Sequence, residues 1–474
     1  MEKRMKTFGL PTGIAIAITA IGLTTGAEAQ TVQTKQYDDG GVYEGEFLEG
    51  KQHGTGTYRL PNGYEYTGEW IEGEIRGQGV ATFPNGSVYE GSFVAGKPEG
   101  QGRITFADGG TFEGEWIDGN ITGQGVAEYA NGVVYQGEFR NAMHHGVGIM
   151  TSPGGYVYEG EWINGTKEGQ GKITYPDGAI YDGTLKGGER DGSGTLTMAD
   201  GLIYSGEWVD GQIQGLGTLT QPNGDVYEGD LVAGRREGNG KVTYSNGDVY
   251  EGTFVTDRRE GTGTFRGIDG YVYTGAWVAG QIEGNGEVTY PDGSVYVGSF
   301  KDDLAHGNGK ITYPDGSSYE GDWDMGVING TGIATYVNGL TYEGEFVNAK
   351  NHGQGKMTYD DGYVYEGQWL EGQRNGMGRA TYADGTIYVG EFVNGQRNGN
   401  GEITLPDGFT YVGDWTEGEI NGRGVATYAN GDVYEGAFVR GRREGEGTMR
   451  YASGQESTGI WSDGALVSES GADN

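Results

Sequence analysis

Histidine is the residue type that most often binds a transition metal or transfers a proton near neutral pH, and this chain of 474 residues has five of them. Four stand at the same position of a 23-residue repeat, at His53, His145, His306 and His352, and His144 completes one adjacent pair. Equivalent side chains in successive strand pairs lie about 10 Å apart, too far for one metal ion. We therefore interpret the histidines as local hydrogen-bonding groups beside a glycine, and we expect no metal site and no cofactor.

The sequence shows no grouping of residues that is typical of a catalytic site. No serine, histidine and acid group together outside the repeat, and the repeat leaves little sequence for a separate catalytic domain. We expect no catalytic residues and predict that the protein is not an enzyme.

Carboxylates could bind cations if they lined up along a sheet. Eight glutamates are expected on the outward face of first strands: Glu44, Glu46, Glu69, Glu90, Glu113, Glu115, Glu159 and Glu161. Side by side they would form an acidic ladder able to hold calcium weakly. No Asp-x-Asp-x-Asp-Gly loop accompanies them, so a solvated anionic face is the preferred interpretation.

Arginine pairs could hold phosphate groups. The candidate basic edge consists of Arg235, Arg236, Arg258, Arg259, Arg442 and Arg443, and it is extended by Lys51, Lys97, Arg190, Arg374 and Arg397. Each arginine pair is followed by an acid, at Glu237, Glu260 or Glu444, which weakens the local positive potential. The alternatives are an edge for anionic ligands and a mixed, solvated edge.

Regularly spaced aromatic rings form the candidate interaction face. Such rings could stack on sugars, bind a partner strand or pack against a second copy. A single-layer sheet without a covering helix favours some exposure of the rings, and the alternative is that a twisted sheet closes over them. The residues of this face are Tyr43, Phe47, Tyr66, Trp70, Tyr89, Phe93, Trp116, Tyr342, Phe346, Tyr365, Trp369, Tyr411 and Trp415.

A strict 23-residue period determines which elements carry these residues. Eighteen complete copies begin between Tyr43 and Tyr434, and a nineteenth begins at Ser457. In the copy that starts at Tyr89, alternation predicts strands over 89–93 and 100–106. Residues 94–99 are expected to form a hairpin loop, and 107–109 a turn to the next copy. Gly100, Gly102, Ile104 and Phe106 are expected to share the inner face, where the glycines make room for rings of the neighbouring strand.

The repeat resembles the membrane occupation and recognition nexus, or MORN, repeat. The copy with Tyr342-Glu343-Gly344-Glu345-Phe346, His352-Gly353-Gln354-Gly355, Thr358-Tyr359 and Asp361-Gly362 matches it almost throughout. The resemblance implies an all-β fold: an elongated array of about 18 β-hairpins in a single extended antiparallel meander. It also implies scaffolding, dimerisation and, in some members, phospholipid binding. Phe112, Leu185 and Leu231 depart from the motif, and no kinase domain of the kind found in some relatives is present.

A second period lies on the first, because phenylalanine and tryptophan alternate at the aromatic position. Most copies with tryptophan at this position carry isoleucine five residues after the tryptophan, as at Ile75 and Ile121. The pattern indicates a 46-residue unit of duplication. The alternation slips between Leu231 and Phe254. We interpret that slip as a seam left by duplication rather than a hinge.

Composition and the N-terminal segment bound the remaining possibilities. A net charge of −36 disfavours nucleic acid as a partner and broad adhesion to anionic membranes. Lys3, Arg4 and Lys6 precede an apolar run that ends near Ala27-Glu28-Ala29, which predicts a signal peptide over 1–29, with an uncleaved anchor as the alternative. With no cysteine, a lipid-modified cysteine and disulfides are excluded.

These inferences give one expected organisation and function. The lead-in spans 30–42, with Tyr37-Asp38-Asp39-Gly40 resembling the turn of a partial copy; the array spans 43–461, and a polar tail spans 462–474. We expect a periplasmic or extracellular, non-enzymatic MORN-repeat scaffold that binds a protein partner or itself, possible homodimers included. The alternative is a module for phospholipid headgroups or cell-envelope glycans.

Overall fold

The structure is a computed structural model that describes residues 32–469. The predicted signal peptide and residues 470–474 of the predicted tail lie outside the described residues. Every regular element in the described range is a β-strand, so the predicted all-β class is confirmed. A search of the same range finds no helix long and apolar enough to cross a membrane.

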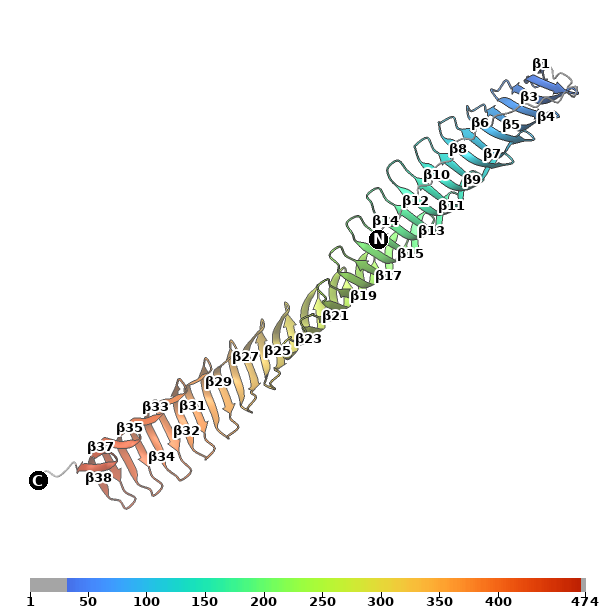
Figure 1. Cartoon of the computed structure of the whole chain (residues 1–474). Coiled ribbons are helices and arrows are strands. Elements are labelled where there is room, and N and C mark those ends of the chain that lie inside the picture. The colour runs from blue at the N-terminus through green and yellow to red at the C-terminus, as the bar shows by residue number, and fades with distance from the viewer. Residues whose placement is uncertain (1–31, 470–474) are drawn as a thin grey trace, which may run out of the picture. The chain divides into compact units, whose positions relative to one another are not determined.

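The described residues divide into two compact units, 32–189 and 190–469. The first contains β1 (Val32–Gln36), β2 (Val42–Leu48), β3 (Lys51–Arg59), β4 (Glu65–Ile71), β5 (Glu74–Thr82), β6 (Val88–Val94), β7 (Lys97–Thr105), β8 (Thr111–Ile117), β9 (Asn120–Glu128), β10 (Val134–Arg140), β11 (Met143–Thr151), β12 (Val157–Ile163), β13 (Thr166–Thr174) and β14 (Ile180–Lys186). Each of these strands pairs antiparallel with its neighbour in sequence, so the unit is one meander (Figure 1).

The second unit, which begins inside β15 (Glu189–Thr197), repeats the same meander. It continues with β16 (Ile203–Val209), β17 (Gln212–Thr220), β18 (Val226–Val232), β19 (Arg235–Thr243), β20 (Val249–Val255), β21 (Arg258–Arg266), β22 (Val272–Val278), β23 (Gln281–Thr289), β24 (Val295–Lys301), β25 (Leu304–Thr312), β26 (Ser318–Asp324), β27 (Val327–Thr335), β28 (Thr341–Val347), β29 (Lys350–Thr358), β30 (Val364–Leu370), β31 (Gln373–Thr381), β32 (Ile387–Val393), β33 (Gln396–Thr404), β34 (Thr410–Thr416), β35 (Glu419–Thr427), β36 (Val433–Val439), β37 (Arg442–Arg450), β38 (Glu456–Ser462) and β39 (Ala465–Glu469). The sequence seam after Leu231 lies within this unit, and pairing through β18, β19 and β20 follows the ordinary register.

The hairpins form as predicted, but their loops are shorter than the sequence indicated. Only Ala95 and Gly96 separate β6 from β7, where a loop over 94–99 was expected. Both have positive φ, 48° and 80°, as in a type I′ turn, whose twist matches that of the paired strands. Lys97 and Pro98 therefore belong to the second strand.

Gly100 lies in a β-bulge, so its expected place on the inner face is wrong. Its φ is 75°, and the pairing of β6 with β7 slips between Gly91 and Phe93. A glycine in the left-handed region allows one extra residue on the bulged strand and increases the local twist. After the bulge, the predicted alternation of inward and outward residues returns, as the burial of Ile104 shows.

Phe106 is also misplaced by the alternation rule, because it begins the turn to the next hairpin and is 38% exposed. Its N–H donates to the Gly110 carbonyl over 2.8 Å, and the Gly109 N–H donates to the Phe106 carbonyl over 3.0 Å. Asp108 Oδ1 accepts from the Gly110 N–H over 2.9 Å. Gly109 has φ of 91°, a conformation that favours glycine.

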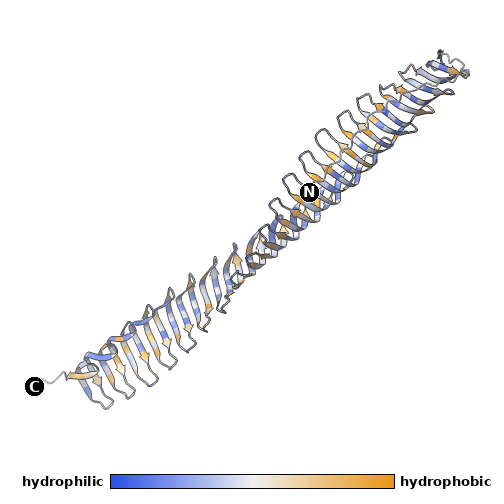
Figure 2. Ribbon diagram, in the orientation of Figure 1, coloured by the Kyte–Doolittle hydropathy of each residue, from blue (hydrophilic) through white to orange (hydrophobic). Residues whose placement is uncertain are grey.

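Short strands end the described sheet at both termini. β1 pairs with β2, and the Gly40 N–H donates to the Tyr37 carbonyl over 3.0 Å, which confirms the partial copy before Tyr43. The region expected to be a polar tail from Ser462 onward includes β39, which pairs with β38. Figure 2 shows that the strands of each unit mix apolar and polar residues, as alternation requires.

Turn strain gives a first prediction. Ala349 occupies the second turn position with φ of 58°, whereas Gly372 occupies the same position one copy later with φ of 86°. The left-handed region costs a side-chain-bearing residue roughly 1–2 kcal/mol, part of which glycine loses again through unfolded-chain entropy. We expect Ala349→Gly to raise the thermal midpoint, with about 1 kcal/mol of stabilisation, and Gly372→Ala to lower it. Equal midpoints in both variants would contradict this account of the turn.

Candidate interaction surface

The aromatic residues proposed as an interaction face form the core of the array. Twelve of the thirteen are at most 6% exposed and Phe47 is half-buried, so the expected exposure of this face is wrong. The buried twelve are Tyr43, Tyr66, Trp70, Tyr89, Phe93, Trp116, Tyr342, Phe346, Tyr365, Trp369, Tyr411 and Trp415. A partner could reach these rings only if the packing opened.

Paired glycines explain how one layer of strands buries such large rings. Gly45 and Gly56 are register partners in β2 and β3, and the Tyr43 ring lies over both. A Cβ atom at Gly56 would lie 2.2 Å from Tyr43 Oη, and one at Gly45 would lie 2.6 Å from it. The Tyr43 hydroxyl donates to the Glu46 carbonyl over 3.0 Å, which fixes the ring flat against the backbone. The sequence-based expectation that glycines make room for rings is confirmed at Gly102, where a Cβ would lie 2.1 Å from Tyr89 Oη, but not at Gly100.

Neighbouring copies then interlock edge to face. The Tyr43 and Trp70 ring centroids are 5.0 Å apart, and those of Tyr66 and Phe93 are also 5.0 Å apart. Such T-shaped pairs contribute about 0.5–1.5 kcal/mol beyond burial of their area. Every tryptophan also donates its indole N–H to a glycine carbonyl of the preceding copy, over 3.0–3.4 Å: Trp70, Trp116, Trp162, Trp208, Trp277, Trp323, Trp369, Trp415 and Trp461.

Burial keeps the phenol groups of the core tyrosines, which form one aromatic row along the array, protonated. Desolvation raises the pKa of Tyr89 to about 12, and that of Tyr296 to about 12. The row tyrosines therefore remain hydrogen-bond donors at neutral pH, and their hydroxyls are engaged in the array's own backbone bonds.

The second arginine of each proposed pair packs on the aromatic core. The Arg259 guanidinium lies 4.4 Å from the Trp277 ring centroid, and that of Arg443 lies 4.6 Å from the Trp461 centroid. Arg236 lies 5.3 Å from the Phe254 centroid. The first arginines, at Arg235, Arg258 and Arg442, are exposed. The proposed basic edge is therefore half structural and half solvent-facing, and Arg442 also pairs with Asp463.

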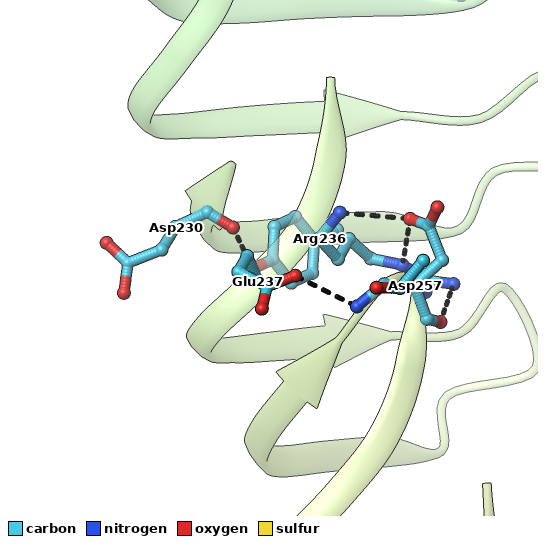
Figure 3. A network of polar contacts seen from close by, with 6 residues as sticks. Asp230, Arg236, Glu237 and Asp257 are labelled. Atoms are coloured by element: carbon cyan, nitrogen blue, oxygen red, sulfur yellow. Dashed lines mark hydrogen bonds and ion pairs between the residues drawn. The ribbon is translucent and has the colours of Figure 1, made fainter. Parts of the chain in front are cut away.

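Figure 3 shows how one such arginine joins successive hairpins. The Arg236 side chain donates from Nη2 to the Asp257 carbonyl over 2.7 Å, and its backbone N–H donates to Asp257 Oδ1 over 2.9 Å. Beside it, Glu237 Oε2 accepts from the Thr256 N–H over 2.9 Å. Arg236 and Glu237 thus bind the turn of the following hairpin rather than a ligand.

The position that sometimes holds histidine serves the same purpose as Glu237. His306 Nδ1 accepts from the Met325 N–H over 3.5 Å, and Glu260 Oε2 accepts from the Ala279 N–H over 2.8 Å. Any side chain with an acceptor at this reach can satisfy the turn amide, which explains why histidine, glutamate and glutamine interchange. The bond reaches the next copy, whereas the sequence predicted a local hydrogen bond.

The proposed acidic ladder is interrupted by partners within the array. Glu44 pairs with Arg59 over 3.8 Å, Glu113 pairs with Arg103 over 3.5 Å, and Glu161 Oε1 accepts from the Gln170 N–H over 3.4 Å. Within residues 32–469, no group of three or more histidine or acidic residues is placed to hold one metal ion.

A second aromatic row, which the alternation rule did not predict, lies at the turns between hairpins. We call this row the turn ridge; it consists of the aromatic residues that open such turns after the lead-in, at Phe83, Phe106, Tyr129, Tyr175, Tyr244, Tyr290, Tyr313, Tyr336, Tyr359, Tyr382, Tyr428 and Tyr451. These rings are half-buried or exposed, reaching 40% at Tyr129. The available signal was an aromatic two residues before Asp-Gly or Asn-Gly, and alternation placed it on the inner face instead.

Comparison with known families identifies the repeat. The model of the MORN repeat matches residues 43–63, 66–88, 89–111, 112–134, 135–155, 158–180, 181–203, 204–226, 227–249, 250–270, 273–295, 296–318, 319–341, 342–362, 365–387, 388–410, 411–433 and 434–456. No curated protein sequence matches the chain.

Similar solved structures add little. The SAS-4 TCP domain of Drosophila melanogaster, in complex with a proline-rich motif of Ana2, is 12% identical over 42% of this chain and 88% of that chain, with a TM-score of 0.21. The TCP10 domain of Danio rerio CPAP is 16% identical over 47% of this chain and 94% of that chain, with a TM-score of 0.20. Scores this low carry no argument about the present chain or its ligands.

The glycine contact yields a second prediction. A Cβ at Gly148 would lie 2.3 Å from the Tyr135 hydroxyl oxygen, whereas one at Gly154, in the same copy, would meet nothing within 4 Å. Gly148→Ala must displace the ring and should cost about 1–3 kcal/mol, as overpacking does. Thermal and denaturant midpoints should fall for Gly148→Ala and change little for Gly154→Ala. Similar losses in both variants would rule out the ring contact as the reason for glycine.

A third prediction concerns His144, which stacks on Tyr135 with centroids 3.7 Å apart and contacts the Tyr129 hydroxyl over 2.7 Å. Burial lowers the pKa of His144 from 6.5 to about 4. Because the unfolded chain takes up this proton first, the stabilising contribution is complete above pH 6.5 and is lost as pH falls towards 4.

Histidine NMR resonances should show one ring, absent in His144→Gln, that titrates with a midpoint near 4. Protonation of His144 favours the unfolded chain. The denaturation midpoint of the wild type should therefore fall more than that of His144→Gln as pH falls from 6.5 to 4. A midpoint near 6.5 for that ring would contradict the stacked, desolvated position.

Proposed function

Because the chain belongs to the MORN repeat family, we propose that it is an exported, non-enzymatic scaffold that binds other proteins or a second copy of itself. MORN repeats are protein- and membrane-binding modules, and the assignment to protein binding rests on one feature of this chain. The turn ridge offers half-exposed rings of the same kind at successive hairpins. Aromatic side chains are enriched at protein interfaces because they supply large contact areas with few rotatable bonds.

Self-association requires a surface other than the buried aromatic row. β1, at the start of the described sheet, is exposed along its length. In β39 only Leu466 is half-buried, and Val467 is 62% exposed. Edge strands of this kind present unpaired backbone groups that can pair with another chain. The net charge of −36 opposes close approach of two copies, so any self-association should strengthen with salt.

Export and oligomeric state are tested together. We expect the chain expressed in its host to be recovered outside the cytoplasm with Gln30 as its first residue, by N-terminal mass spectrometry. Light scattering that gives the absolute mass, over a concentration series at low and high salt, then separates the two scaffold modes. A doubled mass indicates self-association, and a monomer leaves binding to other proteins as the scaffold mode to test. An intact N-terminus in a cytoplasmic fraction would contradict the proposal of export.

A second candidate, binding of phospholipid headgroups or envelope glycans, is favoured by the exposed first arginines Arg235 and Arg258. Co-sedimentation with vesicles containing phosphatidylserine tests the lipid arm. If the basic edge binds lipid, Arg235→Gln with Arg258→Gln should abolish co-sedimentation. Equal recovery with neutral vesicles would exclude headgroup binding by this edge, and glycan arrays test the remaining arm.

A further inference from the structure

We propose that the turn ridge of the second unit binds a basic, proline-rich segment of a partner protein in the polyproline II conformation. This inference rests on the proposed scaffold function and specifies its surface and the chemistry of its partner. The surface consists of five consecutive ridge tyrosines, Tyr290, Tyr313, Tyr336, Tyr359 and Tyr382.

These tyrosines are held in place by their turns. The Tyr313 N–H donates to the Ser317 carbonyl over 2.8 Å, and the Gly316 N–H donates to the Tyr313 carbonyl over 2.9 Å; Tyr336 has the same two bonds with Leu340 and Gly339. The rings remain 37% exposed at Tyr313 and 39% exposed at Tyr336. Because the turn bonds fix the backbone at each tyrosine, less conformational freedom remains to be lost on binding, which favours affinity.

The spacing of the ridge selects the partner's conformation. Each copy contributes two strands at about 4.8 Å, so equivalent rings recur at about 9.6 Å. A polyproline II helix advances about 3.1 Å per residue with three residues per turn, or about 9.3 Å per turn. Every third residue of such a segment therefore faces one ridge ring, and the mismatch of about 0.3 Å per copy stays small over five copies. An extended β-strand, at about 3.3 Å per residue and a period of two, repeats its facing side chains every 6.6 Å and loses register within one copy.

Ring chemistry agrees with this choice. Aromatic grooves recognise proline because its ring is apolar and its backbone is already extended, so little entropy is lost on docking. Outside the five proposed tyrosines, the ridge rings Tyr428 and Tyr451 line a 640 Å³ hollow that also contains the cationic Arg443.

Charge sets the sign of the residues between the prolines. A carboxylate follows the ridge tyrosine by two residues in four of the five copies, at Asp292, Asp315, Asp361 and Asp384. Each accepts a backbone N–H bond in its own turn over 2.8–2.9 Å. The bonded N–H groups hold the pKa of Asp292 and Asp384 below its usual range, so these groups stay ionised at neutral pH. These carboxylates, together with the net charge of −36 of the whole chain, favour arginine or lysine in the partner segment.

A second exposed apolar column of this unit does not fit the same partner. It runs along the hairpin turns and consists of aliphatic residues, among them Val347 at 41% and Leu370 at 48% exposure. These side chains have no aromatic faces on which proline rings could stack, and they provide a matched control surface in the same unit.

The test uses the mature full-length chain and three labelled synthetic peptides of about fifteen residues. One carries proline at every third position with arginine between, one has the same composition with prolines at irregular spacing, and one replaces arginine with glutamate. Fluorescence anisotropy should show binding of the first peptide, with Kd at least about tenfold weaker for each of the other two. No binding of the first peptide, or equal Kd for regular and irregular spacing, would overturn the inference.

Variants locate the site. Tyr313→Ser with Tyr336→Ser should weaken the first peptide at least about tenfold, whereas Tyr313→Phe with Tyr336→Phe keeps the rings and should bind within about twofold. Val347→Ser with Leu370→Ser should leave the Kd unchanged. Circular dichroism confirms that each variant is folded, and a Phe pair as weak as the Ser pair would overturn ring stacking as the source of affinity.

Failure of this inference and failure of the scaffold function give different results. Cross-linking in the host that captures a protein partner without proline-rich sequence would refute the polyproline II assignment and leave the scaffold function standing. A monomeric chain that cross-links to no protein would refute the scaffold function itself.

Discussion

The packing of a tyrosine ring flat against two paired glycines is the contact on which the rest of the array depends. Only glycine leaves the backbone open enough for Tyr43 to lie over Gly45 and Gly56 while its hydroxyl bonds to the Glu46 carbonyl. The ring can then present its edge and face to Trp70 of the next copy. Across residues 32–469, a single layer of strands thereby obtains a buried core without a second sheet or a covering helix.

Contacts between successive copies explain why the repeat tolerates some changes and not others. In several copies the first turn amide of a hairpin bonds to an acceptor from the copy before it, and histidine and glutamate both supply one, as His306 and Glu260 show. The aromatic alternation has a similar basis. Arginines in copies with phenylalanine or leucine, such as Arg190 and Arg397, lie 4.0 and 4.4 Å from the tryptophan of the following copy. Isoleucine pairs with the tryptophan of its own copy, as Ile75 does with Trp70. The 46-residue period is thus a packing period.

The two aromatic rows differ in exposure, and the proposed binding function rests on the exposed one. Tyr342 is fully buried and its hydroxyl is bonded within the array, whereas Tyr336, six residues earlier, is 39% exposed at a turn. The residue that opens a turn can change without disturbing the buried aromatic row. Met198 and Gln221 stand at ridge positions, and their turns keep the same two backbone hydrogen bonds. Such freedom is what an interaction surface on a rigid scaffold requires.

The sequence by itself determined the period, the all-β class, the hairpin unit and the MORN family, because each follows from residue spacing and from a motif repeated eighteen times. Only the tertiary structure decided which aromatic rings are accessible. Alternation assigns Tyr89 and Phe93 to one face, but whether that face is covered depends on ring tilt and on contacts from the next copy. The positive φ of Ala95 and the bulge at Gly100 likewise come from strand pairing, since nothing local in Ala-Gly requires a type I′ turn. Phe106 was misplaced for the same reason: a turn ends the alternation at a point that only the backbone hydrogen bonds define.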